Sequence, residues 1–154
     1  MIRMIDDRGL SLCRFQALLF EQSIGKIDSS SSYFIKCFMN SPVAAQIDKD
    51  SFVFEAENTE SIFEKLNTEY RFGRGNAKYT SDSLFWIGYV YRYWCYTYQI
   101  SSKAVYRTIR ADEMNSLYLP YHTMDPTAAI RRILEAKSIN ERDPLESLKR
   151  VYGY

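Results

Sequence analysis

The sequence predicts an all-α protein, a single compact domain over residues 1–154 whose helices pack around one central helix rich in aromatic residues. Apolar residues recur at intervals of three and four in most segments, which is the period of a helix with one buried face. Ser, Thr, Asn and Pro stand between these segments, where helices begin and end. The composition agrees, because 46% hydrophobic and 25% charged residues are the usual balance of a self-folding globular domain.

Three helices are predicted in the N-terminal third. In the first, over about 10–27, the apolar residues follow helical spacing. The serines at 29–32 offer N-caps for a second helix, whose aromatic and apolar residues share one face. Ser41 before Pro42 is a start signal for a short third helix to Asp48, because proline is tolerated at the first helical position.

Three segments precede the central helix: an extended segment, a further helix and a loop. Residues 51–55 have the pattern of an extended segment or a lone strand. A further helix is predicted from Thr59 to near Tyr70, with Asn58 or Thr59 as its cap. Residues 71–78 hold two glycines, an asparagine and three cations, which predicts an exposed loop.

The central helix is predicted over about residues 82–98. The cluster of Thr, Ser and Asp at 80–83 supplies its N-cap and an acidic first turn. The helix is apolar on nearly every side, and a helix of that kind is buried among others. Residues 99–101 end it, and a short helix follows over about 102–109.

The C-terminal part is predicted to cover the core. A segment over 111–118 leads to a turn at 119–122, and Asp125 with Pro126 opens the next helix. The tail is mixed in charge and carries a short helix near 145–151.

The location that the sequence predicts is the cytoplasm. The N-terminus alternates charged and apolar residues too closely for a signal peptide. The one membrane candidate, 83–102, contains Arg92 and five tyrosines whose phenol groups would need partners in hydrocarbon, so no membrane association is expected. A net charge of +1 provides no field that would attract nucleic acid or an anionic bilayer.

No catalytic, metal or cofactor site is recognisable. His122 is the only histidine, which excludes sites that need two imidazoles. The three cysteines lack a CxxC pair and suit buried thiols. An enzyme that uses Cys95 or the carboxylate pair Glu60 and Glu64 has no spacing evidence behind it, and the loop at 73–78 lacks the spacing of a phosphate-gripping motif.

Two features leave alternatives open. The tyrosine-rich helix is either a core helix or an aromatic platform for a partner, and both readings hold if they apply to different faces. Residues 82–109 have the order of a helix-turn-helix, whose second helix would present Ser102, Lys103, Tyr106 and Arg107 to a major groove, with Arg110 also facing the DNA.

Several motifs resemble those of a group of small bacterial proteins. They are DSLFWIGY at 82–89, YRYW at 91–94 and YHTMDP at 121–126, with FMNS at 38–41 upstream. Proteins of this group are encoded beside toxin-like genes, among them a predicted ADP-ribosyltransferase-like protein and a very small helical protein whose own motif is similar to ISSKAVY at 100–106. The resemblance implies an antitoxin or accessory role in a toxin-antitoxin cassette.

The leading hypothesis is therefore a non-enzymatic protein-binding module that covers the active cleft of a toxin, possible partners being an ADP-ribosyltransferase-like toxin or a second copy of the chain. The surface residues expected to bind the partner are Arg71, Arg74, Lys78, Tyr91, Arg92 and Tyr121. The alternative is a DNA-binding regulator of its own operon that uses Lys103, Arg107 and Arg110.

Overall fold

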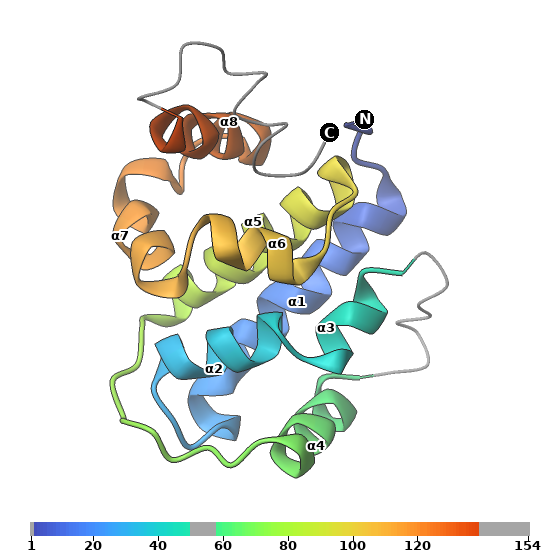
Figure 1. The fold of residues 1–154 in the computed structure, drawn as a ribbon. Helices are drawn as coiled ribbons and strands as arrows, with labels where there is room; N and C mark the ends of the chain where they lie inside the picture. The colour runs from blue at the N-terminus through green and yellow to red at the C-terminus, as the bar shows by residue number, and fades with distance from the viewer. Residues whose placement is uncertain (1, 50–57, 139–154) are drawn as a thin grey trace.

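The computed structural model describes residues 2–49 and 58–138, and every regular element within these ranges is an α-helix (Figure 1). The helices are α1 (Asp7–Lys26), α2 (Ser31–Met39), α3 (Pro42–Ile47), α4 (Thr59–Glu69), α5 (Ser81–Tyr98), α6 (Ser102–Thr108), α7 (Ala111–Tyr121) and α8 (Pro126–Lys137). The all-α prediction is confirmed for this part of the chain. The strand predicted at 51–55 and the helix predicted at 145–151 lie outside the described residues.

The helices begin where short polar side chains satisfy their first free N–H groups. Asp6, for example, accepts a hydrogen bond from the Gly9 N–H at 2.8 Å, so α1 starts earlier than its apolar pattern indicates. Side-chain caps of this kind open α1 to α6 and α8, from Asp6, Ser30, Ser41, Asn58, Thr80, Ser101 and Asp125.

The turn predicted at 119–122 is wrong, because α7 continues through Pro120 to Tyr121. Proline lacks an N–H and clashes with the carbonyl four residues before it, which is costly in the middle of a helix. Pro120 lies in the last turn, and the N–H of His122, two residues further along the chain, donates to the Tyr118 carbonyl at 2.9 Å. The helix therefore continues past the proline to its C-cap, His122.

Helix α5 runs through the middle of the molecule, and α1, α6, α7 and α8 all pack against it (Figure 1). The closest approach is to α1, at Gly88. A Cβ atom at Gly88 would lie 2.8 Å from the Gln16 carbonyl oxygen and 3.0 Å from the Ala17 Cα. The missing side chain lets the two backbones meet.

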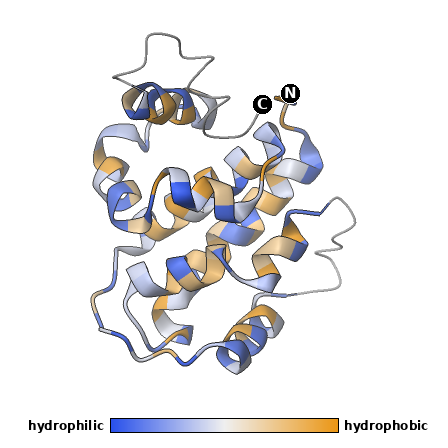
Figure 2. Ribbon diagram, in the orientation of Figure 1, coloured by the Kyte–Doolittle hydropathy of each residue, from blue (hydrophilic) through white to orange (hydrophobic). Residues whose placement is uncertain are grey.

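The core continues from α1 to α2 through edge-to-face aromatic contacts. The ring of Phe20 on α1 lies 5.6 Å from that of Phe34 and 5.3 Å from that of Phe38. Figure 2 shows the hydrophobic stretches mainly where helices face one another and hydrophilic ones on α4 and at the start of α1. Among the described residues, no helix combines the length and apolar character that a membrane span requires.

Candidate functional site

The predicted loop at 71–78 is exposed, and it is tied to the turn between α1 and α2. The Ser30 N–H donates to the Arg74 carbonyl at 3.1 Å, and the Ser31 N–H donates to the Ala77 carbonyl at 3.0 Å. The Lys78 ammonium donates to the carbonyls of Ile27 at 2.6 Å and Ser29 at 2.5 Å. Partial burial lowers the pKa of that ammonium.

Two of the predicted surface residues are buried, and the expectation that they face a partner directly is wrong. Tyr91 is 0% exposed and its hydroxyl donates to the Ile109 carbonyl at 2.7 Å, while Arg92 is 1% exposed. Both side chains are buried because α1, α6, α7 and α8 pack around α5 and cover the positions of Tyr91 and Arg92. Arg71 and Arg74 are exposed, and Tyr121 is half-buried against the core.

Arg92 is the centre of a buried polar network that joins four helices or their ends. Its Nε donates to Oε1 of Gln16 at 2.9 Å, and one terminal nitrogen donates to Oδ1 of Asp48 at 2.6 Å. The other terminal nitrogen donates to the Ser102 hydroxyl at 2.9 Å. The Ser102 hydroxyl donates to Oδ1 of Asp48 at 2.7 Å and its N–H to Oδ2 at 2.9 Å. The Arg92–Asp48 ion pair joins the end of α3 to α5, and the hydrogen bonds of Ser102 join the start of α6 to both.

This network changes the expected DNA-reading face of α6. Ser102 is 1% exposed and Tyr106 is 6% exposed, so neither side chain is presented to a groove as predicted. Both point inward because α6 packs against α5 and α2. Lys103, Arg107 and Arg110 are exposed.

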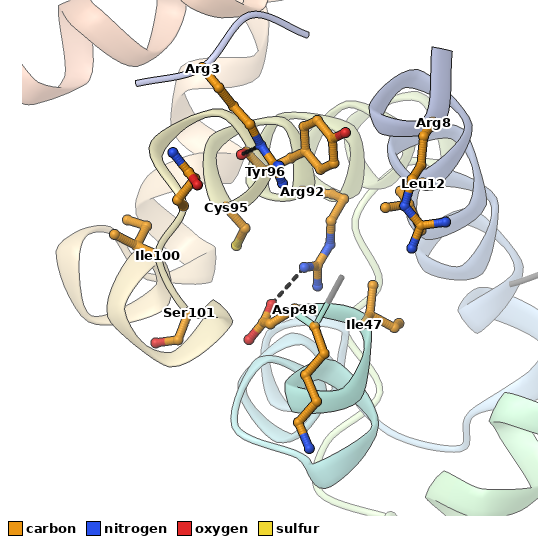
Figure 3. A pocket seen from close by; sticks show the side chains of 12 residues that line it. Arg3, Arg8, Leu12, Ile47, Asp48, Arg92, Cys95, Tyr96, Ile100 and Ser101 are labelled. Atoms are coloured by element: carbon orange, nitrogen blue, oxygen red, sulfur yellow. Dashed lines mark hydrogen bonds and ion pairs between the residues drawn. The ribbon is translucent and has the colours of Figure 1, made fainter. Parts of the chain in front are cut away.

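The polar network opens into a pocket of about 270 Å³ between the N-terminal segment, α1, α3 and the α5–α6 turn (Figure 3). We call it the basic pocket, because the described residues that line it include four cations and one carboxylate. The lining residues are Arg3, Arg8, Leu12, Ile47, Asp48, Lys49, Arg92, Cys95, Tyr96, Gln99, Ile100 and Ser101.

The three arginines of the basic pocket come from three different segments. Figure 3 shows Arg92 pointing from α5 towards Asp48, with Arg3 and Arg8 on other sides of the same space. The guanidinium of Arg3 lies 3.8 Å from the centroid of the Tyr96 ring, and its Nε donates to the Tyr96 carbonyl at 2.9 Å. These contacts fix the position of the Arg3 charge.

A second depression, of about 470 Å³, lies between α1, α5, α7 and the start of α8. We call it the aromatic groove, and its lining residues are Glu21, Asp82, Phe85, Trp86, Tyr89, Val90, Tyr118, His122, Met124 and Pro126. The rings are arranged in contact with one another, with Phe85 stacked near Tyr89 at 6.4 Å between centroids.

The α7 side of the aromatic groove is also ordered by ring contacts. The Tyr118 and His122 rings stack at 4.5 Å, and Trp86 meets Tyr118 edge-on at 6.0 Å. Nδ1 of His122 lies 2.8 Å from the Tyr118 carbonyl oxygen, which can only accept, so this nitrogen carries a proton. Leu119, which directly follows Tyr118 on α7, is 78% exposed.

The described residues offer little to a nucleophilic mechanism. All three cysteines are free and buried, and burial raises the pKa of Cys13 and of Cys95 to about 12. A protonated thiol is a poor nucleophile. Glu60 pairs with Lys26 on the surface. Within residues 2–49 and 58–138, no three His, Cys, Asp or Glu side chains gather as metal ligands would.

Comparison of the chain with protein-family models, curated proteins and solved structures finds no match.

Neither depression was predicted from the sequence as a site. Arg3 and Arg8 lie in the N-terminal stretch of alternating charged and apolar residues, and their charge alone does not indicate a pocket. The sequence places Phe85 and Tyr89 on the tyrosine-rich helix, but their half-exposed position depends on how α7 and α8 pack. A signal that was available is their spacing of four residues, which places both on one face of a helix.

Proposed function

We propose that the chain is a non-enzymatic protein-binding module that acts in the cytoplasm as the antitoxin or accessory member of a toxin cassette. The observation that supports binding is the aromatic groove. Its half-exposed rings Phe85 and Tyr89 are of the residue types that dominate protein interfaces, and tyrosine is enriched at binding hot spots.

The charge of the aromatic groove selects the chemistry of the partner. Glu21 and Asp82 are the carboxylates among its lining residues, and no lysine or arginine lines it. A cation over an aromatic face gains from the ring quadrupole, and a carboxylate nearby adds to that attraction. The occupant that fits is a segment of a partner protein that brings a lysine or arginine together with apolar side chains.

The loop at 71–78 lies outside the contact surface that we propose. The Lys78 ammonium donates hydrogen bonds to two carbonyls of the α1–α2 turn, so this side chain stabilises the fold of the chain. Arg71 and Arg74 remain exposed and serve as the comparison in the experiment.

The test is affinity capture of the tagged protein from its native cells, with wild type, a Phe85→Ser/Tyr89→Ser double variant and an Arg71→Ala/Arg74→Ala double variant. We expect a protein retained in stoichiometric amount by wild type and by the loop variant and lost from the groove variant. Equal retention by all three would refute the groove, and recovery of the tagged chain alone would refute the protein-binding function in favour of self-association.

The antitoxin role needs a second experiment. The captured partner, expressed alone, is expected to arrest growth, and co-expression with the wild-type chain is expected to restore it. Failure of the groove variant to restore growth would link the toxin to the groove. A partner without toxicity would remove the antitoxin role and leave the binding function.

A second candidate function rests on the exposed cations of α6. Lys103 and Arg107 are four residues apart and so share a face of that helix, and Arg110 follows its end. Binding of duplex DNA through these cations predicts an affinity that falls steeply as salt is raised. If no duplex is retained even at low salt, DNA binding is excluded.

A further inference from the structure

A surface formed by the start of α2 and the segment after α4 carries half-buried aromatic rings beside exposed cations. We call it the ring surface, and its residues are Tyr33, Lys36, Tyr70, Arg71, Phe72 and Arg74. Figure 1 shows the segment after α4 passing the beginning of α2, and the Ser30 N–H joins the two by donating to the Arg74 carbonyl at 3.1 Å. The ring surface shares no residue with the lining of the aromatic groove.

The rings of this surface contact one another and are anchored to the core. The Tyr33 and Phe72 rings meet edge-on with their centroids 6.2 Å apart, and the Tyr70 ring lies 6.0 Å from that of Phe72. The Phe72 ring in turn lies 6.5 Å from that of Phe34, which is 1% exposed. All three outer residues are half-buried, so each keeps an accessible part. Together they form a platform on which a planar group can stack.

The cations lie next to these rings. Lys36 follows Tyr33 by three residues on α2, which places both on one face of the helix. The Arg74 guanidinium lies over the Tyr33 ring, 5.5 Å from its centroid, and this contact orients the side chain without neutralising its charge. Lys36, Arg71 and Arg74 are exposed and form no ion pair within the described part of the chain. The adjoining carboxylate in the chain is that of Glu69, at the end of α4.

The segment that carries the two arginines is fixed to the α1–α2 turn. The Ser29 hydroxyl donates to the Arg74 carbonyl at 3.1 Å and accepts from the Arg74 N–H at 3.1 Å. Gly73 and Gly75, with φ of 104° and 77°, take the left-handed conformation that favours glycine and turn the chain on both sides of Arg74. A segment held in this way loses little conformational entropy when a ligand binds.

Rings beside cations match the two parts of an unpaired nucleotide. An aromatic ring stacks on an exposed base, and a guanidinium stacks on a base or binds phosphate oxygens. In a duplex the bases already stack on one another, so rings on a protein surface cannot reach their faces. An acidic peptide would pair with the cations but has no planar bases for the rings. RNA is the nucleic acid whose loops and ends expose unpaired bases.

We propose that the ring surface binds single-stranded RNA. Tyr33, Tyr70 and Phe72 provide the stacking platform for the bases. Lys36 and Arg71 bind phosphate oxygens, and Arg74 adds its positive charge from its position over the Tyr33 ring. The site is separate from the proposed protein-binding function and does not require it.

The test is fluorescence anisotropy of a labelled RNA strand of about 12 nucleotides without self-complementarity, titrated with the full-length protein at low ionic strength. We expect binding that weakens steeply as salt is raised, because bound phosphates release their counterions. The same strand annealed to its complement should bind at least about tenfold more weakly, because its bases cannot stack on the rings. Absence of binding to the single strand would refute the site, and equal affinity for the duplex would refute the stacking. Displacement of the RNA by an equal concentration of polyglutamate would assign the surface to an acidic protein instead.

Two substitutions of one ring separate stacking from a structural effect. Tyr33→Leu keeps an apolar side chain but removes the ring, and it should raise the Kd for the single strand by about tenfold. Tyr33→Phe keeps the ring and should leave the Kd unchanged. An unchanged Kd in Tyr33→Leu, or an equal loss in both variants, would refute the stacking. An unchanged melting temperature establishes that each variant is folded.

A pair of double variants locates the phosphate contacts. Arg71→Ala/Arg74→Ala should raise the Kd by about tenfold and make it less dependent on salt. Arg131→Ala/Arg132→Ala removes two exposed arginines of α8, at the opposite end of the molecule from α4 (Figure 1), and should change neither quantity. Equal weakening by the α8 variant would show a general effect of charge and refute the site.

A failure of this site is distinguishable from a failure of the proposed function. The Phe85→Ser/Tyr89→Ser variant leaves the ring surface in place, so it should bind RNA like the wild type although it loses the protein partner. The Arg71→Ala/Arg74→Ala variant should show the reverse.

Discussion

Removal of the Asp48 carboxylate should destabilise this protein far more than removal of a surface carboxylate. Asp48→Ala leaves the Arg92 guanidinium buried without its ion-pair partner, and it also removes the acceptor of two hydrogen bonds from Ser102. Breaking one side of a buried ion pair typically costs about 3–5 kcal/mol. The Asp48 side chain is 15% exposed against 2% for Arg92, so water reaches part of the pair and we expect a value near the lower limit, about 3 kcal/mol.

The assay is urea denaturation followed by circular dichroism. With a slope of about 2 kcal/mol per molar urea, a loss of about 3 kcal/mol lowers the midpoint by roughly 1.5 M. The matched control is Glu113→Ala, which breaks the Lys137–Glu113 pair, whose side chains are 33% and 53% exposed. A pair of that exposure contributes no more than about 1 kcal/mol, so its midpoint should fall by no more than about 0.5 M.

A second substitution separates loss of the ion pair from general damage to α3. Arg92→Met added to Asp48→Ala removes the unpaired cation and fills much of its volume, so the double variant should be more stable than Asp48→Ala alone. The reasoning is refuted if Asp48→Ala costs no more than Glu113→Ala, or if Arg92→Met lowers stability equally with and without Asp48.

Two further predictions concern the α1–α5 crossing and the buried thiols. Gly88→Ala places a Cβ 2.8 Å from the Gln16 carbonyl oxygen and should lower the free energy of unfolding, measured by urea titration, by roughly 1–3 kcal/mol, whereas Gly25→Ala meets no atom within 4 Å and should raise it by up to about 1 kcal/mol. Burial raises the pKa of Cys13 and Cys95 from 9.0 to about 12, so both thiols should resist a thiol reagent in the folded protein and react after unfolding in urea. Because the unfolded thiols lose their protons first, their contribution to stability is complete below pH 9.0 and declines as pH rises towards about 12.

Each of these has an outcome that contradicts it. Gly88→Ala with unchanged stability would mean that α1 and α5 separate at no cost, contrary to the close contact at this position. Rapid labelling of Cys13 or Cys95 under native conditions, located by mass spectrometry, would mean that the core around these thiols opens to the reagent.

The sequence predicted the helices well because the signals that start a helix are local. Ser41 with Pro42, and Asp125 with Pro126, cap their helices as the sequence indicates, since a cap bonds only to residues two or three positions away. The exception is the end of α7, where the proline predicts a turn but the helix continues through Pro120 to Tyr121.

The candidate sites were harder to predict because their residues are distant in sequence. The aromatic groove combines Glu21 of α1 with Phe85 of α5 and His122 beyond α7, and no local pattern relates the three. The basic pocket likewise combines Arg3 with Asp48 and Arg92. The loop cations, which the sequence does group together, are partly occupied in bonds within the fold.

By itself, the sequence determined the helical class, the start of most helices and the central place of the tyrosine-rich segment, because periodicity and caps act over a few residues. Tertiary structure alone decided that Arg92 is buried. An arginine on a helix that is apolar on nearly every side reaches solvent unless partners enclose it, and its partners Gln16 and Asp48 lie 76 and 44 residues away in the chain. Whether a polar side chain on such a helix becomes part of the core or part of a surface depends on which distant groups can satisfy its hydrogen bonds and charge.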